Sequence, residues 1–162
     1  MLKNKRKISA VINNAKKFKE IVQKYGSFHN YIESYNSTTS FENLMLFKED
    51  LEANFDYLGG ITVYHFMTDI GLPVLKPDRV IVRIFRRIGL IENEKQLLKT
   101  IIHEKKFAIA TENSIRYIDI IFVSYGQESE IGVCLLKNPK CHLCGLTNIC
   151  NYFKNKLNNN VK

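Results

Sequence analysis

The sequence predicts an all-α fold that ends in a metal-binding loop near the C-terminus. Apolar residues recur at intervals of three and four along most of the 162 residues, which is the spacing of amphipathic helices. No segment alternates with a period of two, and the apolar run 118–123 is assigned to a buried helix because it lies within a longer helical pattern. All four cysteines fall in one stretch with the spacing C-x6-C-x2-C-x5-C: Cys134, Cys141, Cys144 and Cys150.

The first part of the chain should form three helices with clear start and stop signals. One apolar stripe runs over residues 8–25, and Gly26 is suited to end that helix. Residues 28–35 predict a short helix. After a polar loop, Ser40 is a suitable N-cap for a helix over residues 41–55, because its hydroxyl can accept a hydrogen bond from a backbone N–H of the first turn.

A glycine-containing hairpin over residues 57–61 should connect this helix to the next one. The following helix is predicted over residues 62–70, with Gly71 at its end. Pro77 is suited to the first turn of another helix that runs through Ile88, since a first-turn residue needs no N–H for the helical hydrogen bonds.

Two more long helices are predicted before the cysteines. Asn93 and Gln96, three residues apart, form a capping pair for a helix that reaches about Ala110. Asn113 is the predicted cap of a helix over residues 115–127. The Asn-rich stretch 155–162 is predicted to be a polar tail.

The composition indicates a soluble, basic protein. Hydrophobic residues make up 45% of the chain, which is enough for a buried core. No apolar run approaches membrane-spanning length and the N-terminus has no leader pattern, so we expect a cytoplasmic protein that does not bind membranes. The 24 Lys and Arg against 16 Asp and Glu give a net charge of +8, which favours a polyanionic partner.

The cysteines indicate a bound metal. Four thiolates from one loop can hold a [4Fe–4S] cluster, and closely spaced cysteines in a chain otherwise free of them are usually ligands. A tetrahedral zinc site is an alternative, although only Cys141 and Cys144 form the close pair typical of zinc sites. Two disulfides or free buried thiols are further alternatives, and a reducing cytosol argues against the disulfides.

Two further features carry chemistry. The turn Leu58-Gly59-Gly60 precedes a helix, so its backbone N–H groups and the helix dipole can bind a phosphate without reading base sequence. The alternative is an ordinary helix connection in which glycine supplies a positive φ. Asp78 opens an arginine-bearing helix, and by itself an Asp in that place is commonly only a cap.

In this order the features resemble the helix-hairpin-helix DNA glycosylases of the endonuclease III superfamily. They are a glycine hairpin with its helix, then Gly71-x-Pro73-x4-Asp78 leading into the arginine-bearing helix, then the cysteine motif. The resemblance covers residues 4–154. Three stretches are most similar to 3-methyladenine DNA glycosylase I, and the C-terminal half is more similar to its iron–sulfur-bearing relatives; the stretches are 5–16, 28–32 and 60–67.

The resemblance implies a monofunctional base-excision repair enzyme acting on double-stranded DNA. Such an enzyme flips a damaged purine, for example 3-methyladenine, out of the duplex and hydrolyses its N-glycosidic bond. Asp78 would be the catalytic carboxylate, and no lysine occurs between Lys48 and Lys76, where a bifunctional enzyme has its Schiff-base lysine. DNA phosphates would be bound by the hairpin and by the loop between the first two cysteines, through Leu58, Gly59, Gly60, Ile61, Thr62, Lys137 and Lys140.

The resemblance also implies how the chain is organised. Residues 1–133 would form one helical domain with the helix-hairpin-helix at 41–70. Residues 134–154 would form the iron–sulfur loop, packed on that domain. The protein is expected to be a monomer associated with the nucleoid.

The chain departs from the family in its first part. Family members have helices ahead of the matching segment, with an aromatic residue, often Trp, that stacks on the extruded base, and this chain has no Trp. The alternative is therefore an N-terminally truncated, catalytically inactive DNA-binding module of the same fold. Such a module would bind DNA through phosphates, with a steep dependence on salt.

Overall fold

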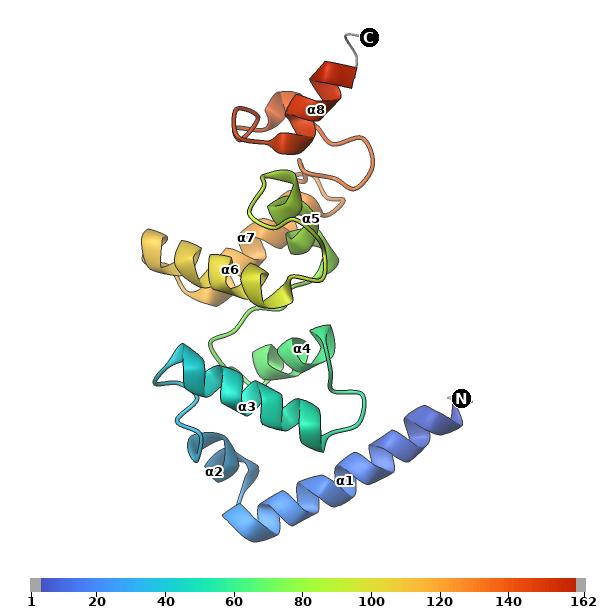
Figure 1. Cartoon of the computed structure of the whole chain (residues 1–162), viewed down its shortest axis with the longest axis vertical. Helices are drawn as coiled ribbons and strands as arrows, with labels where there is room; N and C mark the ends of the chain where they lie inside the picture. Colours follow the sequence, from blue (N-terminus) through green and yellow to red (C-terminus); the bar gives the residue numbers. More distant parts are fainter. Residues whose placement is uncertain (1–3, 160–162) are drawn as a thin grey trace. The chain divides into compact units, whose positions relative to one another are not determined.

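The computed structural model describes residues 4–159, which form helices and connecting segments but no strand (Figure 1). The predicted all-α class is confirmed. The chain divides into two compact units, Met1–Pro73 and Val74–Lys162. Their boundary falls inside residues 1–133, the range expected to form one domain. No helix in the described part is long and apolar enough to pass through a lipid bilayer.

The first unit consists of four helices: α1 (Lys5–Tyr25), α2 (Phe28–Glu33), α3 (Phe41–Asn54) and α4 (Ile61–Asp69). Side-chain caps fix where three of them begin. The side chains of Asn4, Ser27 and Ser40 accept hydrogen bonds from backbone N–H groups of α1, α2 and α3. Gly26 ends α1 with a φ of 82°, which glycine adopts without steric cost. The predicted Ser40 cap and Gly26 end are confirmed.

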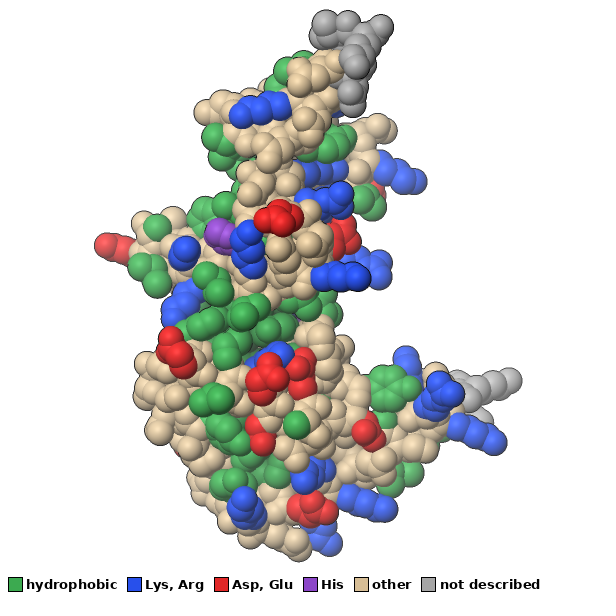
Figure 2. Space-filling model, in the orientation of Figure 1, with side chains coloured by type: hydrophobic (Ala, Val, Ile, Leu, Met, Phe, Trp, Pro, Cys, Tyr) green, Lys and Arg blue, Asp and Glu red, His purple; other side chains and the backbone are tan. Residues whose placement is uncertain are grey.

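The core of this unit lies between α3 and α4. Its fully buried side chains are Phe47, Leu51, Val63 and Met67. Tyr31 of α2 adds its ring to that of Phe47, with 5.4 Å between the ring centroids. By contrast, α1 exposes hydrophobic side chains among its lysines (Figure 2), namely Ile8, Val11, Ile12 and Phe18. The apolar stripe of α1 is therefore only partly buried.

The second unit is built around α5 (Arg79–Arg87). Three helices contact it: α6 (Leu97–Thr111), α7 (Ile115–Gly126) and α8 (Asn151–Asn159). On its buried face, Ile81 and Phe85 have no exposed surface. The ring of Phe85 meets that of Phe122 edge to face, at 5.0 Å. Because Phe122 lies within α7, the run 118–123 is helical as predicted, but it is not fully buried as expected, since Ile120 and Ile121 are exposed.

The start of α5 differs from the prediction. The sequence predicts Pro77 in the first helical turn, but Pro77 lies ahead of the N-cap, which is Asp78. The Asp78 carboxylate accepts hydrogen bonds from the N–H groups of Val80 and Ile81, so the helix begins only at Arg79.

The starts of α6 and α7 also differ from the predicted caps. Asn93 and Gln96 do not form a reciprocal capping pair, because the Gln96 side chain accepts from the N–H of Glu92 instead, and α6 begins directly after Gln96. Ser114, rather than Asn113, caps α7, since its hydroxyl accepts a hydrogen bond from a first-turn N–H. A neighbouring serine therefore makes the cap of α7, whereas no side-chain cap hydrogen bond forms at the start of α6.

The last helix, α8, lies where the sequence predicts the end of the cysteine loop and then a polar tail. Its described residues extend to Asn159, and residues 160–162 lie outside the described part of the chain. Asparagine is a weak helix former, so this helix depends on packing. Tyr152 supplies part of that packing, because its ring stacks on the Arg87 guanidinium at 4.4 Å.

Candidate functional site

The turn between α3 and α4 is anchored to α1 by two asparagines. Asn14 bonds twice to the backbone of Asp56, donating to its carbonyl at 2.9 Å and accepting from its N–H at 2.8 Å. Asn13 donates to the Asp56 carboxylate at 3.0 Å. Gly60 then enters α4 with φ 60° and ψ −121°, a conformation that favours glycine strongly. The turn at residues 57–61 is therefore held in one conformation.

A carboxylate from the same chain binds the amide at the start of α4. The Gly60 N–H donates to Glu52 Oε1 at 2.9 Å, and the other Glu52 oxygen pairs with Lys48 at 2.7 Å. The Gly60 N–H is one of the groups expected to bind a DNA phosphate, and the helix N-terminus favours an anion there. A phosphate could reach this amide only by displacing Glu52.

Asp78 is half-buried at the N-terminus of α5. Its Oδ1 accepts both capping hydrogen bonds, at 2.8 Å from the N–H of Val80 and at 3.0 Å from that of Ile81. The helix N-terminus stabilises its negative charge. The cap thus fixes the orientation of the carboxylate without using Oδ2.

Two other acidic side chains of this unit are buried and interact electrostatically with Asp78. Glu104 of α6 is fully buried, and neither of its oxygens has a hydrogen-bond partner among the described residues. Burial, together with the charges of Asp119 and Asp78, raises the pKa of Glu104 to about 9. Burial also raises the pKa of Asp119, although Arg116 at 2.9 Å opposes that shift. Glu104 is therefore protonated at neutral pH.

Two arginines of α5 hold the segment that carries the first cysteine. Arg83 donates to the backbone carbonyls of Gly126 and Cys134, the latter at 3.3 Å. Arg87 donates to the Leu135 carbonyl at 2.7 Å and to the Cys134 sulfur at 3.2 Å. The cysteine loop is therefore fastened to the same helix that begins at Asp78.

The four cysteines line one small cavity of about 20 Å³. All four are described, and none forms a disulfide. Cys141 opens the short 3-10 helix η1 (Cys141–Leu143), and Cys150 is buried directly ahead of α8. In the described part of the chain, no group of three or more His, Cys, Asp or Glu side chains is arranged to hold a metal ion. The cavity has room for about one water molecule, so a metal cluster would fit only if the loop widened.

The predicted site residues are divided between the two units. The first unit contains the turn residues Leu58, Gly59, Gly60, Ile61 and Thr62. The second unit contains Asp78, the four cysteines, Lys137 and Lys140. Within the second unit, α5 connects Asp78 to the cysteine loop, where Lys137 is exposed and Lys140 is half-buried.

Sequence reasoning missed the roles of Glu52, Arg83 and Arg87. The arginines could have been found from their spacing, because Arg79, Arg83 and Arg87 recur every four residues and so share one face of a helix. For Glu52 there was no such signal, since nothing in the local pattern pairs it with an amide eight residues later.

Residues 1–76 match the family model of methyladenine glycosylase, which supports a DNA glycosylase family. The match contains the whole first unit, including the glycine turn and α4, and ends just before Asp78. It covers a little under half of the chain. Methyladenine glycosylases act on DNA in base excision repair, and the all-helical structure is consistent with that class. Comparison with curated proteins and with solved structures gives no match.

Proposed function

We propose that this protein is a monofunctional DNA glycosylase that hydrolyses the N-glycosidic bond of a damaged purine in double-stranded DNA. The observation that carries the proposal is the match of residues 1–76 to methyladenine glycosylase. That match supports an alkylated purine, such as 3-methyladenine, as the substrate class. The net charge of +8 supports a polyanionic partner.

In this proposal Asp78 is the catalytic carboxylate. Departure of the base leaves positive charge on the sugar, which a fixed anion nearby stabilises. The two capping bonds orient Asp78 through Oδ1, so Oδ2 is the oxygen that would face the sugar or accept a proton from the attacking water. Glu104, being protonated at neutral pH, adds no competing negative charge to these surroundings.

Incubation of the purified protein with methylated duplex DNA is expected to release the methylated base and to leave an unbroken strand with an abasic site. The strand should break only after alkali treatment, because the sequence has no lysine between Lys48 and Lys76 to form a Schiff base with the sugar. Chromatography of the released base and a denaturing gel of the strand measure the two outcomes, with unmethylated duplex as the control. Strand cleavage without alkali would contradict the monofunctional assignment.

A non-catalytic DNA-binding module is the second candidate. It is favoured by the extent of the family match, which includes the glycine turn but ends before Asp78, the proposed catalytic residue. It is also compatible with the phosphate role proposed for the glycine turn. The same incubation separates the two candidates: DNA that is bound but releases no base indicates the module and not the enzyme.

We further propose that Cys134, Cys141, Cys144 and Cys150 hold a [4Fe–4S] cluster, with zinc as the alternative metal. Support comes from the donor set, because four thiols surround one cavity and α5 fastens their loop. When bound, a cluster would tie this loop together and so fix the backbone that presents Lys137 and Lys140 to DNA.

Protein purified without oxygen is expected to be brown and to contain about four iron atoms per chain. Cys144→Ser should lose the colour and most of the iron, because one thiolate ligand is removed. His142→Gln, which alters one of the two residues between Cys141 and Cys144, is the matched control and should keep both the colour and the iron. Elemental analysis that finds zinc in place of iron in a colourless protein would contradict the iron assignment.

A further inference from the structure

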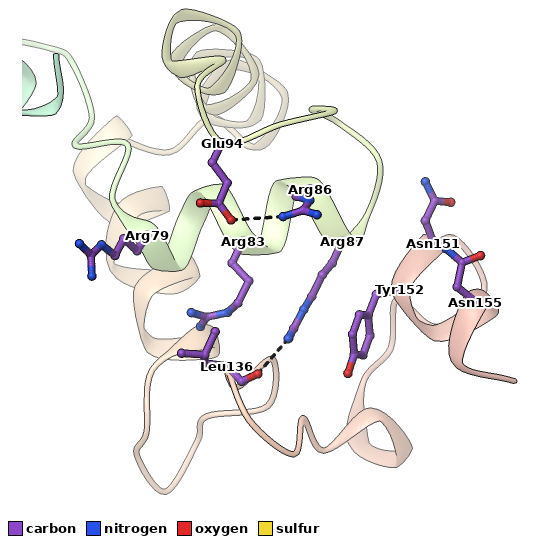
Figure 3. A pocket seen from close by; sticks show the side chains of 9 residues that line it. All are labelled: Arg79, Arg83, Arg86, Arg87, Glu94, Leu136, Asn151, Tyr152 and Asn155. Atoms are coloured by element: carbon purple, nitrogen blue, oxygen red, sulfur yellow. Dashed lines mark hydrogen bonds and ion pairs between the residues drawn. The ribbon is translucent and has the colours of Figure 1, made fainter. Parts of the chain in front are cut away.

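A groove between α5 and α8 is lined by positive charge (Figure 3). Its volume is about 720 Å³, and both of its walls belong to the second unit. Four arginines of α5 line it: Arg79, Arg83, Arg86 and Arg87. Glu94 is the one carboxylate in the lining, so the groove has a formal charge of +3. A concave surface with this charge is suited to an anionic ligand.

The arginines fall into two pairs with different roles. Arg83 and Arg87 are half-buried and donate to the cysteine loop, as described above. Arg79 and Arg86 are exposed. Arg86 pairs with Glu94 at 3.3 Å, but the two side chains are 58% and 67% exposed, and ion pairs so exposed contribute little. The groove therefore offers Arg79 and Arg86 to an external anion.

The remaining lining groups indicate which anion. The opposite wall, from α8, contributes the amide side chains of Asn151 and Asn155 and the ring of Tyr152, and Leu136 of the cysteine loop lines the groove as well (Figure 3). Guanidinium groups bind phosphate oxygens through two parallel hydrogen bonds, and amides add neutral donors. The groove is open and larger than a single phosphate needs, so a chain of linked phosphates fits it better than an isolated ion.

We propose that the α5–α8 groove binds phosphate groups of the DNA backbone. The choice of DNA as the source of the phosphates rests on the proposed function, whereas the phosphate chemistry rests on the groove itself. A free phosphate compound would offer the same chemistry from a different source. In this proposal the groove contacts DNA in addition to the contacts expected from the glycine turn and from the lysines of the cysteine loop.

Binding of the full chain to a fluorescent, undamaged duplex, followed by anisotropy at several salt concentrations, tests the proposal. The double variant Arg79→Gln/Arg86→Gln is expected to bind on the order of tenfold more weakly and to lower the slope of log K against log salt by about two. Lys95→Gln/Lys106→Gln removes two exposed charges from the same unit outside the groove, and should change the slope far less. Equal losses in both variants would overturn the proposal.

A single variant that is expected to bind DNA more tightly excludes misfolding as the cause of the weaker binding of the double variant. Glu94→Gln removes the one carboxylate that lines the groove, and with it a negative charge that repels phosphate, so it is expected to strengthen DNA binding severalfold. Glu92→Gln changes the charge equally, on the same connecting segment but outside the groove, and should strengthen binding less. Weaker or unchanged binding by Glu94→Gln relative to Glu92→Gln would count against the groove.

Inorganic phosphate distinguishes the two sources. If it competes with the duplex no better than sodium chloride of equal ionic strength, the groove requires the linked phosphates of DNA. If it binds the wild type but not Arg79→Gln/Arg86→Gln, while DNA binding is the same in both, the groove takes a free anion and the DNA assignment is overturned. If DNA binding depends on the groove but no base is released, the proposed glycosylase activity is contradicted, whereas phosphate binding by the groove is not.

Discussion

Asp78→Asn is expected to lower the rate of base release by at least about a hundredfold and to leave the stability of the protein nearly unchanged. Asparagine is as good an N-cap as aspartate, so its side-chain oxygen can keep the two hydrogen bonds from the N–H groups of Val80 and Ile81. It carries no negative charge, however, and cannot stabilise a cationic sugar or accept a proton. The substitution therefore separates the cap from the proposed catalytic role.

Three measurements are needed for this prediction. Single-turnover release from methylated duplex gives the rate, anisotropy gives the DNA affinity, and urea unfolding gives the stability. Asp78→Ala is the informative control, because it removes both the charge and the cap and should cost about 1 kcal/mol of stability in addition. Base release by Asp78→Asn at the wild-type rate would leave Asp78 as a structural cap only.

The wild-type protein is expected to lose much of its stability as the pH rises. Glu104→Gln is expected to remove most of that loss. The pKa of Glu104 rises from 4.5 to about 9 in the folded state. Between these values the folded protein holds a proton that the unfolded chain has released, so the free energy of unfolding falls as the pH rises. Over the whole range the loss is roughly 6 kcal/mol as an upper limit.

Urea unfolding at pH 5, 7 and 9 measures this effect, with the expected loss spread over that interval. Glutamine is neutral at every pH, so the variant should show a shallower curve; some slope remains because the pKa of Asp119 is also raised by burial. Glu128→Gln removes an exposed carboxyl of the same unit and should follow the wild type. Parallel curves for the wild type and Glu104→Gln would show that Glu104 is not a buried, protonated acid.

The helices could be predicted from the sequence wherever their signals are local. The Ser40 hydroxyl accepts from an N–H three residues later, and Gly26 ends α1 through its own φ. Prediction failed where two polar groups competed for one helix end, as with Asn113 and Ser114. It also failed for α8, which Tyr152 holds in place through Arg87, a residue of another helix.

The candidate site could be predicted only where its signals are local in the sequence. Asp78 and the glycine turn follow from residues close to each other in the sequence, and the methyladenine glycosylase match includes the turn. The partner of the Gly60 amide could not be predicted, because Glu52 lies eight residues earlier, in α3, and no local pattern pairs the two. Nor could the groove, since its two walls are separated by the whole of α6 and α7.

The sequence by itself determined the helical class, the basic charge, the spacing of the cysteines and the place of Asp78 at a helix start. These properties depend on composition or on contacts within about one helical turn. Only the tertiary structure decided that Arg83 and Arg87 hold the Cys134 segment and that Glu104 is buried without a partner among the described residues. Burial and pairing of a side chain depend on residues far away in the chain, here 47 positions apart for Arg87 and Cys134, and no local pattern records them.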